Sequence, residues 1–379
     1  GHDIHMFLGL ASAFEEHVID LKDVVGTLEK KYGKQVDLAH RSTYNPFTKK
    51  QFAVSDMWVP DPGNYHKKIW TDIGQPNGPA TYEDLVKAAP EIKKKYPQMQ
   101  IPIGIGLSQD IDSNMAVRNM LWCHGGSIQD KDANVVLNSP ETLAALEYAK
   151  RLYSVGMTQA VLSWNAASNN QAFNAQETSY ILNSISAYRT AQANNLPVLE
   201  NYFFVPALKG PTGIMLASEH VMSGYVVWKF SKSQDTAKEF LVALIDASRE
   251  SMLGSQLYNF PSFYGAAADP GTPMNKKIES GAAWIAKQCN NDPFGSKPAD
   301  KLALLAKSQP WSTNLGYPGF ANPAEGEIFD TYVITDMFAK AATGTLSPKD
   351  AMAEASNRAK EIFNKWRKKG MVPGGSKDR

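Results

Sequence analysis

The chain alternates between short apolar runs and longer stretches whose apolar residues recur at helical spacing. The short runs predict strands at 4–8, 51–54, 101–106, 202–205 and 220–228, and we expect the first of them to be buried. The longer stretches predict helices at 12–25, 82–95, 113–124, 140–153, 233–245, 248–258, 275–288, 324–342 and 347–369. Helices that alternate with short apolar strands indicate an α/β protein.

Several of the predicted helices carry recognisable end signals. Thr81 is expected to cap the helix at 82–95, with Asp84 serving the free amides of its first turn. Pro140 opens another helix, because proline is tolerated at the first helical position. Gly125, which is followed by a second glycine, is expected to end the helix at 113–124.

Three proline- and glycine-rich connectors interrupt the alternation, at 58–64, 206–213 and 308–323. Proline and glycine are the residues that most often break regular elements. Three such connectors predict a chain that crosses three times between two lobes joined by a hinge. A ligand is then expected in the cleft, where the connectors and the strand ends meet.

The composition is typical of a globular protein. With 379 residues the chain is too long for one ordinary core, which favours two lobes. Its 39 basic and 38 acidic residues nearly cancel, which argues against a nucleic-acid partner. No apolar run is long enough to predict a membrane-spanning helix. Cys123 and Cys289 are expected to be two separate buried thiols, although a disulfide between them stays open.

The stretch 162–188 interleaves aromatic side chains with neutral amides. It places Trp164 beside Asn165, and Phe173 follows about two helical turns later. Aromatic faces stack on the C–H faces of a sugar ring, and amides both donate and accept hydrogen bonds, so the pattern suits a polar, uncharged, ring-shaped ligand. The alternative is a helix cap with Trp164 and Phe173 in the core, which spacing alone favours.

No recognisable catalytic or cofactor motif is found. The segment from Asp110 to Asn114, D-I-D-S-N, resembles the start of a calcium loop, but Met115 replaces the glycine and Leu121 the acid that such a loop requires. We therefore interpret it as a capped turn. Cysteine–histidine clusters, phosphate-binding loops and nucleophile elbows are also lacking. A pair of carboxylates that converges for glycoside hydrolysis stays open, since any two acids could meet.

Six segments occur in an order that matches one known family. They are G-H-D-I-H-M-F at 1–7, Y-H-K-K-I-W at 65–70 with P-A-T-Y-E-D-L at 79–85, G-G at 125–126 with N-S-P-E at 138–141, the aromatic–amide stretch, K-E-F-L at 238–241, and G-T-L-S-P-K-D-A at 344–351. Together they resemble the family 1 extracellular solute-binding proteins of ABC importers, the maltose-binding-protein-like group. Gln176 stands where the family has a glycine. The family's first strand, helix and second strand have no counterpart ahead of Gly1, so we expect a cropped sequence with an incomplete first lobe.

The resemblance implies an α/β, two-lobed fold of the periplasmic-binding-protein type (type II), with a hinge and an interlobe cleft. We expect lobe I to comprise 1–64 and 211–315, and lobe II to comprise 65–210 and the C-terminal helices at 316–379. The implied function is the capture of a sugar or oligosaccharide by hinge closure, followed by delivery to the permease subunits of an ABC transporter. The implied protein is a monomer of the bacterial periplasm or cell exterior, without catalytic residues, cofactor or metal.

The resemblance also implies which residues line the cleft. In sugar-binding members, aromatic side chains stack on the ring while acids and amides bind its hydroxyl groups. The residues expected at these places are Phe7, Trp58, Asp61, Trp164, Asn165, Asn183, Tyr188, Glu219, His220, Trp311, Asn314 and Tyr317. Each of them could instead be a core or turn residue.

Two other readings stay open. The same fold could bind a non-sugar solute: a polyamine would use Asp61 and Glu219, and a phosphorylated polyol would use Arg118 or Arg189. More remotely, the chain could be a glycosidase.

Overall fold

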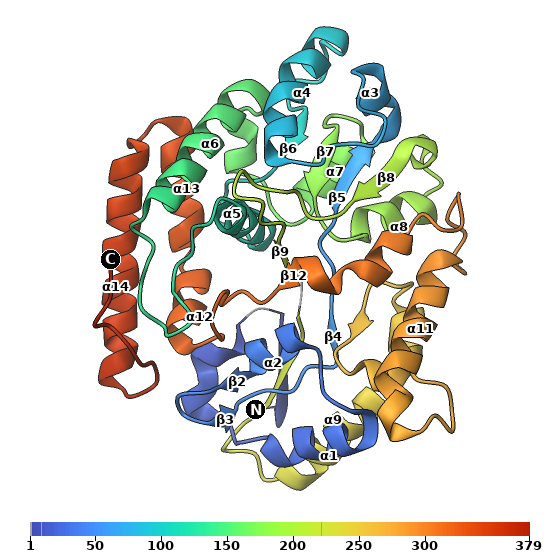
Figure 1. The fold of residues 1–379 in the computed structure, drawn as a ribbon, viewed down its shortest axis with the longest axis vertical. Coiled ribbons are helices and arrows are strands. Elements are labelled where there is room, and N and C mark those ends of the chain that lie inside the picture. The colour runs from blue at the N-terminus through green and yellow to red at the C-terminus, as the bar shows by residue number, and fades with distance from the viewer. Residues whose placement is uncertain (1, 9, 221) are drawn as a thin grey trace.

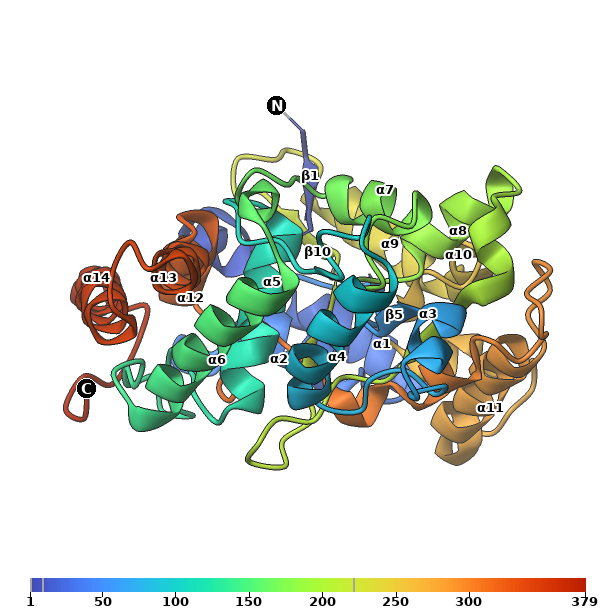
Figure 2. The same cartoon turned by 90° about the horizontal axis from the view of Figure 1, so that it is seen from above.

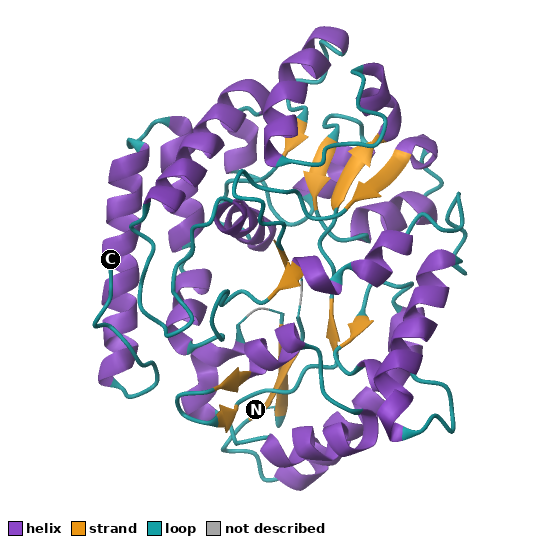
Figure 3. Ribbon diagram, in the orientation of Figure 1, coloured by secondary structure: helices purple, strands orange, loops and turns teal. Residues whose placement is uncertain are grey.

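The computed structural model describes residues 2–8, 10–220 and 222–379. Much of this chain is helical, and the helices surround small groups of strands (Figure 3). The strands are β1 (Ile4–Phe7), β2 (Tyr44–Asn45), β3 (Lys50–Gln51), β4 (Met57–Trp58), β5 (Gly63–His66), β6 (Ile103–Gly104), β7 (Tyr180–Leu182), β8 (Tyr202–Val205), β9 (Ala217–Ser218), β10 (Gly224–Val227), β11 (Phe260–Pro261) and β12 (Ser312–Thr313).

The α-helices are α1 (Lys22–Tyr32), α2 (Asp37–Thr43), α3 (Lys67–Asp72), α4 (Tyr82–Lys95), α5 (Ile111–Cys123), α6 (Pro140–Gly156), α7 (Ser168–Asn174), α8 (Ser186–Ala193), α9 (Gln234–Asp246), α10 (Ser248–Gly254), α11 (Lys277–Asn290), α12 (Pro323–Asp330), α13 (Val333–Thr343) and α14 (Pro348–Lys368). Short 3-10 helices are η1 (Ala11–His17), η2 (Gln159–Leu162), η3 (Pro197–Asn201), η4 (Tyr264–Ala267), η5 (Met274–Lys276), η6 (Ala303–Lys307) and η7 (Gln309–Trp311).

One lobe is built on the four-stranded sheet, whose strand order is β6-β7-β5-β8, and we call it the β5 lobe. β5 runs antiparallel to both of its neighbours, whereas β6 and β7 are parallel. Helices α4, α6, α13 and α14 pack together beside this sheet, and α14 forms the left edge of the molecule in Figure 1. Their apolar faces enclose a large core that includes Trp70, Leu85, Leu121, Leu146 and Phe338.

The second lobe, here the β10 lobe, contains several two-stranded ladders. β1 pairs antiparallel with β10, and β4 pairs antiparallel with β11. Helices α1 and α9 pack against each other, and α9 also contacts β10 (Figure 1, bottom). Leu28, Val227, Leu241 and Phe263 belong to the core that these elements share.

The chain passes between the lobes through buried segments. Residues 59–62 join β4 of the β10 lobe to β5, and every residue of 51–66 is buried. β9 and β12 lie between the lobes and pair in parallel, with Ala217 opposite Ser312 (Figure 1, centre). Because these crossings are buried, the side chains attached to them lie in the interlobe region, where a site is expected.

Two predicted helices are wrong because tertiary contacts interrupt them. The expected helix at 12–25 is η1 followed by α1, since Val18 is extended and bridges Trp228 beside β10. The expected helix at 324–342 is α12 followed by α13, with Tyr332 between them at a φ of 55°. This break lets α12 pack against η1 while α13 packs against α6.

The prediction of a buried strand at 4–8 is also wrong. β1 forms at this place, but the side chains of Met6 and Leu8 are 40% and 46% exposed. Among the described residues β1 pairs only with β10, so its other edge is open. Figure 2 shows β1 projecting from the body of the molecule toward the N-terminus.

The local end signals are confirmed. Thr81 Oγ1 accepts a hydrogen bond from the Asp84 amide at 3.2 Å, and the Asp84 carboxylate accepts one from the Thr81 amide at 2.8 Å. Cys123 and Cys289 are free and buried, as expected. Within the described chain, no helix has the length and apolar character that a bilayer span requires.

Candidate functional site

The candidate site is built around Asp61, which lies in the first crossing between the lobes. Proline residues flank Asp61 on both sides, so neither neighbour offers a backbone amide and both have a restricted φ. His220 follows β9, and its own amide donates to the Val59 carbonyl at 2.8 Å, which holds it beside that crossing. In this arrangement His220 Nδ1 donates to Asp61 Oδ1 at 3.1 Å, and both side chains are buried.

Asn119 of α5 ties this pair to the β5 lobe. Its Nδ2 donates to Asp61 Oδ2 at 3.4 Å, and its Oδ1 accepts a hydrogen bond from the Ser218 amide at 2.7 Å. The Asp61 carboxylate therefore has a hydrogen-bond donor at each oxygen. No partner for His220 Nε2 is found among the described residues, so this nitrogen is free to bond a ligand.

The N-terminus of α5 supplies two more carboxylates. Asp110 is the N-cap and accepts from the Asp112 amide at 3.0 Å, while Asp112 Oδ2 accepts from Asn169 Nδ2 at 3.0 Å. These three residues line one small pocket together with Trp164 and Asn165. Trp164 is half-buried there, whereas Asn165 is exposed and its side chain accepts from the amide of Ala167.

The charges of these groups are coupled across the site. Burial opposes the charged form of His220, but the hydrogen bond and charge of Asp61, followed by the charges of Asp112 and Asp110, raise its pKa above the usual value. Burial raises the pKa of Asp112, and the charges of Asp61 and Asp110 raise it further, against the opposing effects of His220 and Asn169. The protonation of His220 is therefore coupled to the charges of Asp61, Asp112 and Asp110.

Aromatic side chains adjoin the polar cluster. Trp58 is fully buried against Phe260, with ring centroids 5.7 Å apart, and its Nε1 has no hydrogen-bond partner in the described part of the chain. Burial raises the pKa of Tyr258, a hydrogen bond with Ser184 opposes this, and the charges of Asp112 and Asp61 raise it further. The site therefore combines acids, amides and an imidazole with flat apolar surfaces.

Among the described residues, no group of three or more His, Cys, Asp or Glu side chains is arranged to hold a metal ion. Residues 62–280 match the family described as "Bacterial extracellular solute-binding protein", and these residues are more than half of the chain. The chain belongs to this family of bacterial extracellular solute-binding proteins.

Solved structures confirm the two-lobed fold of this solute-binding protein. Maltose-bound MalE3 of T. maritima has a TM-score of 0.72 at 19% identity, over 95% of this chain and 83% of that one. A sugar transporter from Arthrobacter chlorophenolicus A6 with bound laminaribiose has a TM-score of 0.73 at 15% identity, over 96% and 85%. A ribitol-bound solute-binding protein of an ABC transporter from Agrobacterium radiobacter K84 has a TM-score of 0.72 at 17% identity, over 96% and 85%. No curated protein sequence gives a significant match.

Four of the residues predicted for the ligand site of this solute-binding protein meet in the cluster: Asp61, Trp164, Asn165 and His220. Trp58 lies next to it in the first crossing. Their roles in binding stay predictions.

Glu219 precedes His220 in the chain, but its side chain makes its hydrogen bonds away from Asp61. Its Oε1 accepts hydrogen bonds from the Leu315 amide at 3.2 Å and from Ser42 Oγ at 3.3 Å. Burial raises the pKa of Glu219 to about 8, and hydrogen bonds and the charge of Arg41 offset this only in part. Its side chain therefore bonds to the neighbouring crossing beside β12.

The structure does not bring most of the other predicted residues to the cluster. Phe7 stacks on Phe14 at 4.6 Å, and Trp311 is buried against small side chains. Three others make their contacts elsewhere: Tyr188 with Ser296, Asn314 with the Gly319 carbonyl, and Tyr317 with Trp122. Asn183 lies at the edge of the cluster, because its amide donates to the Pro62 carbonyl at 3.3 Å and its Nδ2 donates to Asn170 Oδ1.

Four residues of the cluster were missed by the sequence analysis: Asp110, Asp112, Asn119 and Tyr258. Asn169 lies in the aromatic–amide stretch but was not among the predicted ligand residues. A signal did exist for the first two, because the D-I-D-S-N segment drew attention as a candidate calcium loop. Its rejection as a calcium site was sound, but a capped helix N-terminus can also point its acids at a cleft. Asn119 and Tyr258 lie in ordinary helical and loop contexts that carry no such signal.

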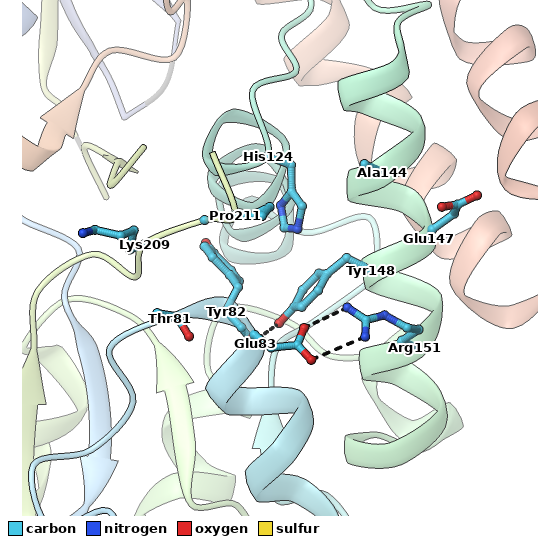
Figure 4. A pocket seen from close by; sticks show the side chains of 11 residues that line it. Thr81, Tyr82, Glu83, His124, Ala144, Glu147, Tyr148, Arg151, Lys209 and Pro211 are labelled. Atoms are coloured by element: carbon cyan, nitrogen blue, oxygen red, sulfur yellow. Dashed lines mark hydrogen bonds and ion pairs between the residues drawn. The ribbon is translucent and has the colours of Figure 1, made fainter. Parts of the chain in front are cut away.

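A larger pocket of about 480 Å³ lies elsewhere on the β5 lobe (Figure 4). The rings of Tyr82, His124 and Tyr148 converge in it, and Arg151 faces Glu83. Its polar groups largely satisfy one another: Tyr148 Oη donates to the Tyr82 carbonyl at 2.7 Å, and Arg151 pairs with Glu83 at 2.8 Å. We therefore do not assign the family's solute to this pocket.

Proposed function

We propose that this protein binds a neutral, polyhydroxylated solute, a sugar or an oligosaccharide, in the cleft between its lobes. The observation that carries the proposal is the small pocket in which Asp112 and Asn169 lie with the ring of Trp164. The hydrogen-bonded pair of Asp61 and His220 is coupled in charge to Asp112 of this pocket. Ionised carboxylates accept hydrogen bonds from hydroxyl groups, amides and an imidazole both donate and accept, and an aromatic face covers the apolar side of a sugar ring.

The charge of the cluster argues against an anionic ligand. None of the described residues that line the small pocket at the N-terminus of α5 is lysine or arginine, whereas Asp110 and Asp112 both line it. A phosphorylated polyol would bring its negative charge next to these acids and Asp61. Two cations were considered for such a ligand, and both are paired: Arg118 is buried in an ion pair with Glu325 at 3.2 Å, and Arg189 pairs with Asp292 at 2.9 Å.

The same acids favour one second candidate, a cationic solute such as a polyamine. Asp61 bonds the imidazole of His220, and the charges of Asp112 and Asp110 also raise its pKa, so a cation would gain attraction there. The salt dependence of binding distinguishes the two candidate ligands, because binding of a polyamine weakens as ionic strength rises whereas binding of a neutral sugar does not.

The wider role follows from the family and its structural relatives. We infer that the protein is a non-catalytic receptor, located in the periplasm or outside the cell, that closes on its ligand and presents it to the permease of an ABC transporter. In this proposal the lobes are 1–64 with 211–315, and 65–210 with 316–379. The protein acts as a monomer and needs no cofactor.

The test is isothermal titration calorimetry with a panel of neutral mono- and oligosaccharides, with spermidine and a sugar phosphate for comparison. We expect saturable binding of at least one neutral saccharide, unchanged by added salt. If spermidine alone showed saturable binding, the ligand would be a polyamine rather than a sugar. Turnover of a chromogenic glycoside by the purified protein would refute the non-catalytic assignment.

A further inference from the structure

A second large pocket, of about 490 Å³, lies on the flank where the two lobes meet. It is enclosed by α8, η3 and the loop that follows α11, on the right of Figure 1. Apolar and aromatic side chains supply much of its wall, among them Tyr188, Leu196, Pro197, Leu199 and Phe294. None of these belongs to the cluster around Asp61, so the pocket is separate from the proposed sugar site.

The feature that distinguishes this pocket is the buried ammonium group of Lys301. The residue lines the pocket and is only 7% exposed. Its Nζ donates one hydrogen bond, to the Leu199 carbonyl at 3.2 Å, and lies over the rings of Phe203 at 4.5 Å and Tyr188 at 5.2 Å. An ammonium group has three N–H donors, so this single hydrogen bond leaves further donors available for a ligand.

Lys301 lacks a carboxylate partner in the described chain. No ion pair between Lys301 and an acid is found within 4.0 Å, although buried charges in proteins are normally paired. The one acid among the pocket's described residues is Glu200, which is exposed. Burial, together with the charge of Lys67, lowers the pKa of Lys301 to about 8.

The other charges nearby do not supply the missing partner. Asp292 is occupied by Arg189 of α8, whose Nη1 lies 2.9 Å from its carboxylate, and by a hydrogen bond from Ser296. Lys297 lines the same pocket and adds a second positive charge at its exposed rim. The pocket of Figure 4 differs in this respect, since its Arg151 is paired with Glu83.

We propose that this flank pocket binds a small organic carboxylate with an aromatic or branched aliphatic body, whose carboxylate pairs with Lys301 Nζ. A single buried ammonium matches one negative charge, and the ligand would provide the counter-ion that the chain does not. The rings of Tyr188 and Phe294 and the side chains of Leu196 and Leu199 would cover the body of the ligand, as apolar walls do in most small-molecule pockets.

The test is calorimetric titration of the whole protein with benzoate, and with benzamide as an uncharged probe of the same shape. The key variant is Lys301→Met, which removes the charge but keeps an apolar chain of similar length. Lys297→Met is the matched control, because it removes an exposed lysine from the same pocket. Circular dichroism of each variant checks that the fold is retained.

We expect wild-type protein to bind benzoate and to bind benzamide much more weakly. Lys301→Met should weaken benzoate binding at least about tenfold, whereas Lys297→Met should change it less than about threefold. Equal binding of benzoate and benzamide, or unchanged benzoate binding by Lys301→Met, would overturn the proposal, as would no detectable binding of benzoate.

A pH series on the wild-type protein gives a readout that does not depend on how a variant folds. Because benzoate pairs with the protonated ammonium, its affinity should fall as pH rises through and beyond about 8, where Lys301 loses its proton. Affinity that stays constant across this range would also overturn the proposal.

Discussion

His220 Nδ1 donates a hydrogen bond to Asp61 Oδ1 across 3.1 Å, and each of the two residues lies in a segment that passes between the lobes. Because Asp61, Asp112 and Asp110 raise the pKa of His220, the folded state binds a proton more tightly than the unfolded state does. The resulting stabilisation is fully present below the usual histidine pKa of about 6.5 and is lost as pH rises through the higher folded value.

The variant His220→Gln tests this relationship, since glutamine cannot titrate. We expect wild-type protein to exceed the variant in unfolding free energy by the largest amount below about pH 6, and by less at about pH 9. Urea denaturation across this range measures the difference. His17→Gln, which changes an exposed histidine of η1, is the control, and a wild-type advantage that grows with pH would contradict the assignment.

Glu219 predicts a second pH dependence, at the crossing beside β12. Burial raises the pKa of Glu219 to about 8, so the folded protein retains a proton that the unfolded chain releases near pH 4.5. The stabilisation is present at low pH and declines by up to about 1.4 kcal/mol per pH unit between these values.

Glu219→Gln resembles the protonated acid and should therefore be more stable than wild type at about pH 9 and nearly equal to it at about pH 5. Thermal denaturation at the two pH values measures this change. Glu177→Gln, at an exposed acid of the β5 lobe, should leave the melting temperature unchanged at both. A Glu219→Gln variant that melts well below wild type at pH 9 would show that the ionised carboxylate is the stabilising form.

Gly281 predicts a steric effect within α11. A Cβ added there would lie 1.7 Å from the Tyr264 carbonyl oxygen of η4, so the helix could not keep its present distance from η4. Alanine normally stabilises a helix by about 1 kcal/mol relative to glycine, but here the clash with a backbone atom should dominate. We expect Gly281→Ala to lower the unfolding free energy by about 1–3 kcal/mol, measured by urea denaturation.

Gly254 of α10 provides the comparison, because a Cβ there would meet no atom within 4 Å. Gly254→Ala should be neutral or stabilising by up to about 1 kcal/mol. If both glycine variants had the same stability, the close packing of α11 on η4 would not be the cause.

The sequence predicted the structure correctly at places where a few neighbouring residues determine it. Thr81 and Asp84 form the expected capping box, and Pro140 lies at the start of α6. The helix breaks at Val18 and Tyr332 could not be predicted from neighbouring residues, because each break depends on contacts with a distant part of the chain. Val18 leaves its helix to pair beside β10, and Tyr332 separates two helices that pack on different neighbours.

The candidate site likewise contains both residues that the sequence analysis predicted and residues that only the fold reveals. Asp61 was predicted from the family resemblance, which placed it at the first crossing between the lobes. Asp112 was read as a turn, and only the fold brings it near His220, which is more than one hundred residues away in the chain. The order of residues in the chain does not show which distant residues come together in the fold. The sequence alone therefore identifies only part of this cluster.

Trp164 and Phe173 belong to the same aromatic–amide stretch, but the structure gives them different surroundings. Trp164 is half-buried in the pocket that contains Asp112, whereas Phe173 is fully buried and stacks on His66 at 3.9 Å between ring centroids. Phe173→Ala should therefore cost about 3–5 kcal/mol of unfolding free energy. Trp164→Ala should cost clearly less, but it should weaken saccharide binding by at least about tenfold, since the stacking surface is lost. Urea denaturation and calorimetry on both variants measure the two effects, and equal losses of affinity in both variants would show that Trp164 acts through the fold rather than through the ligand.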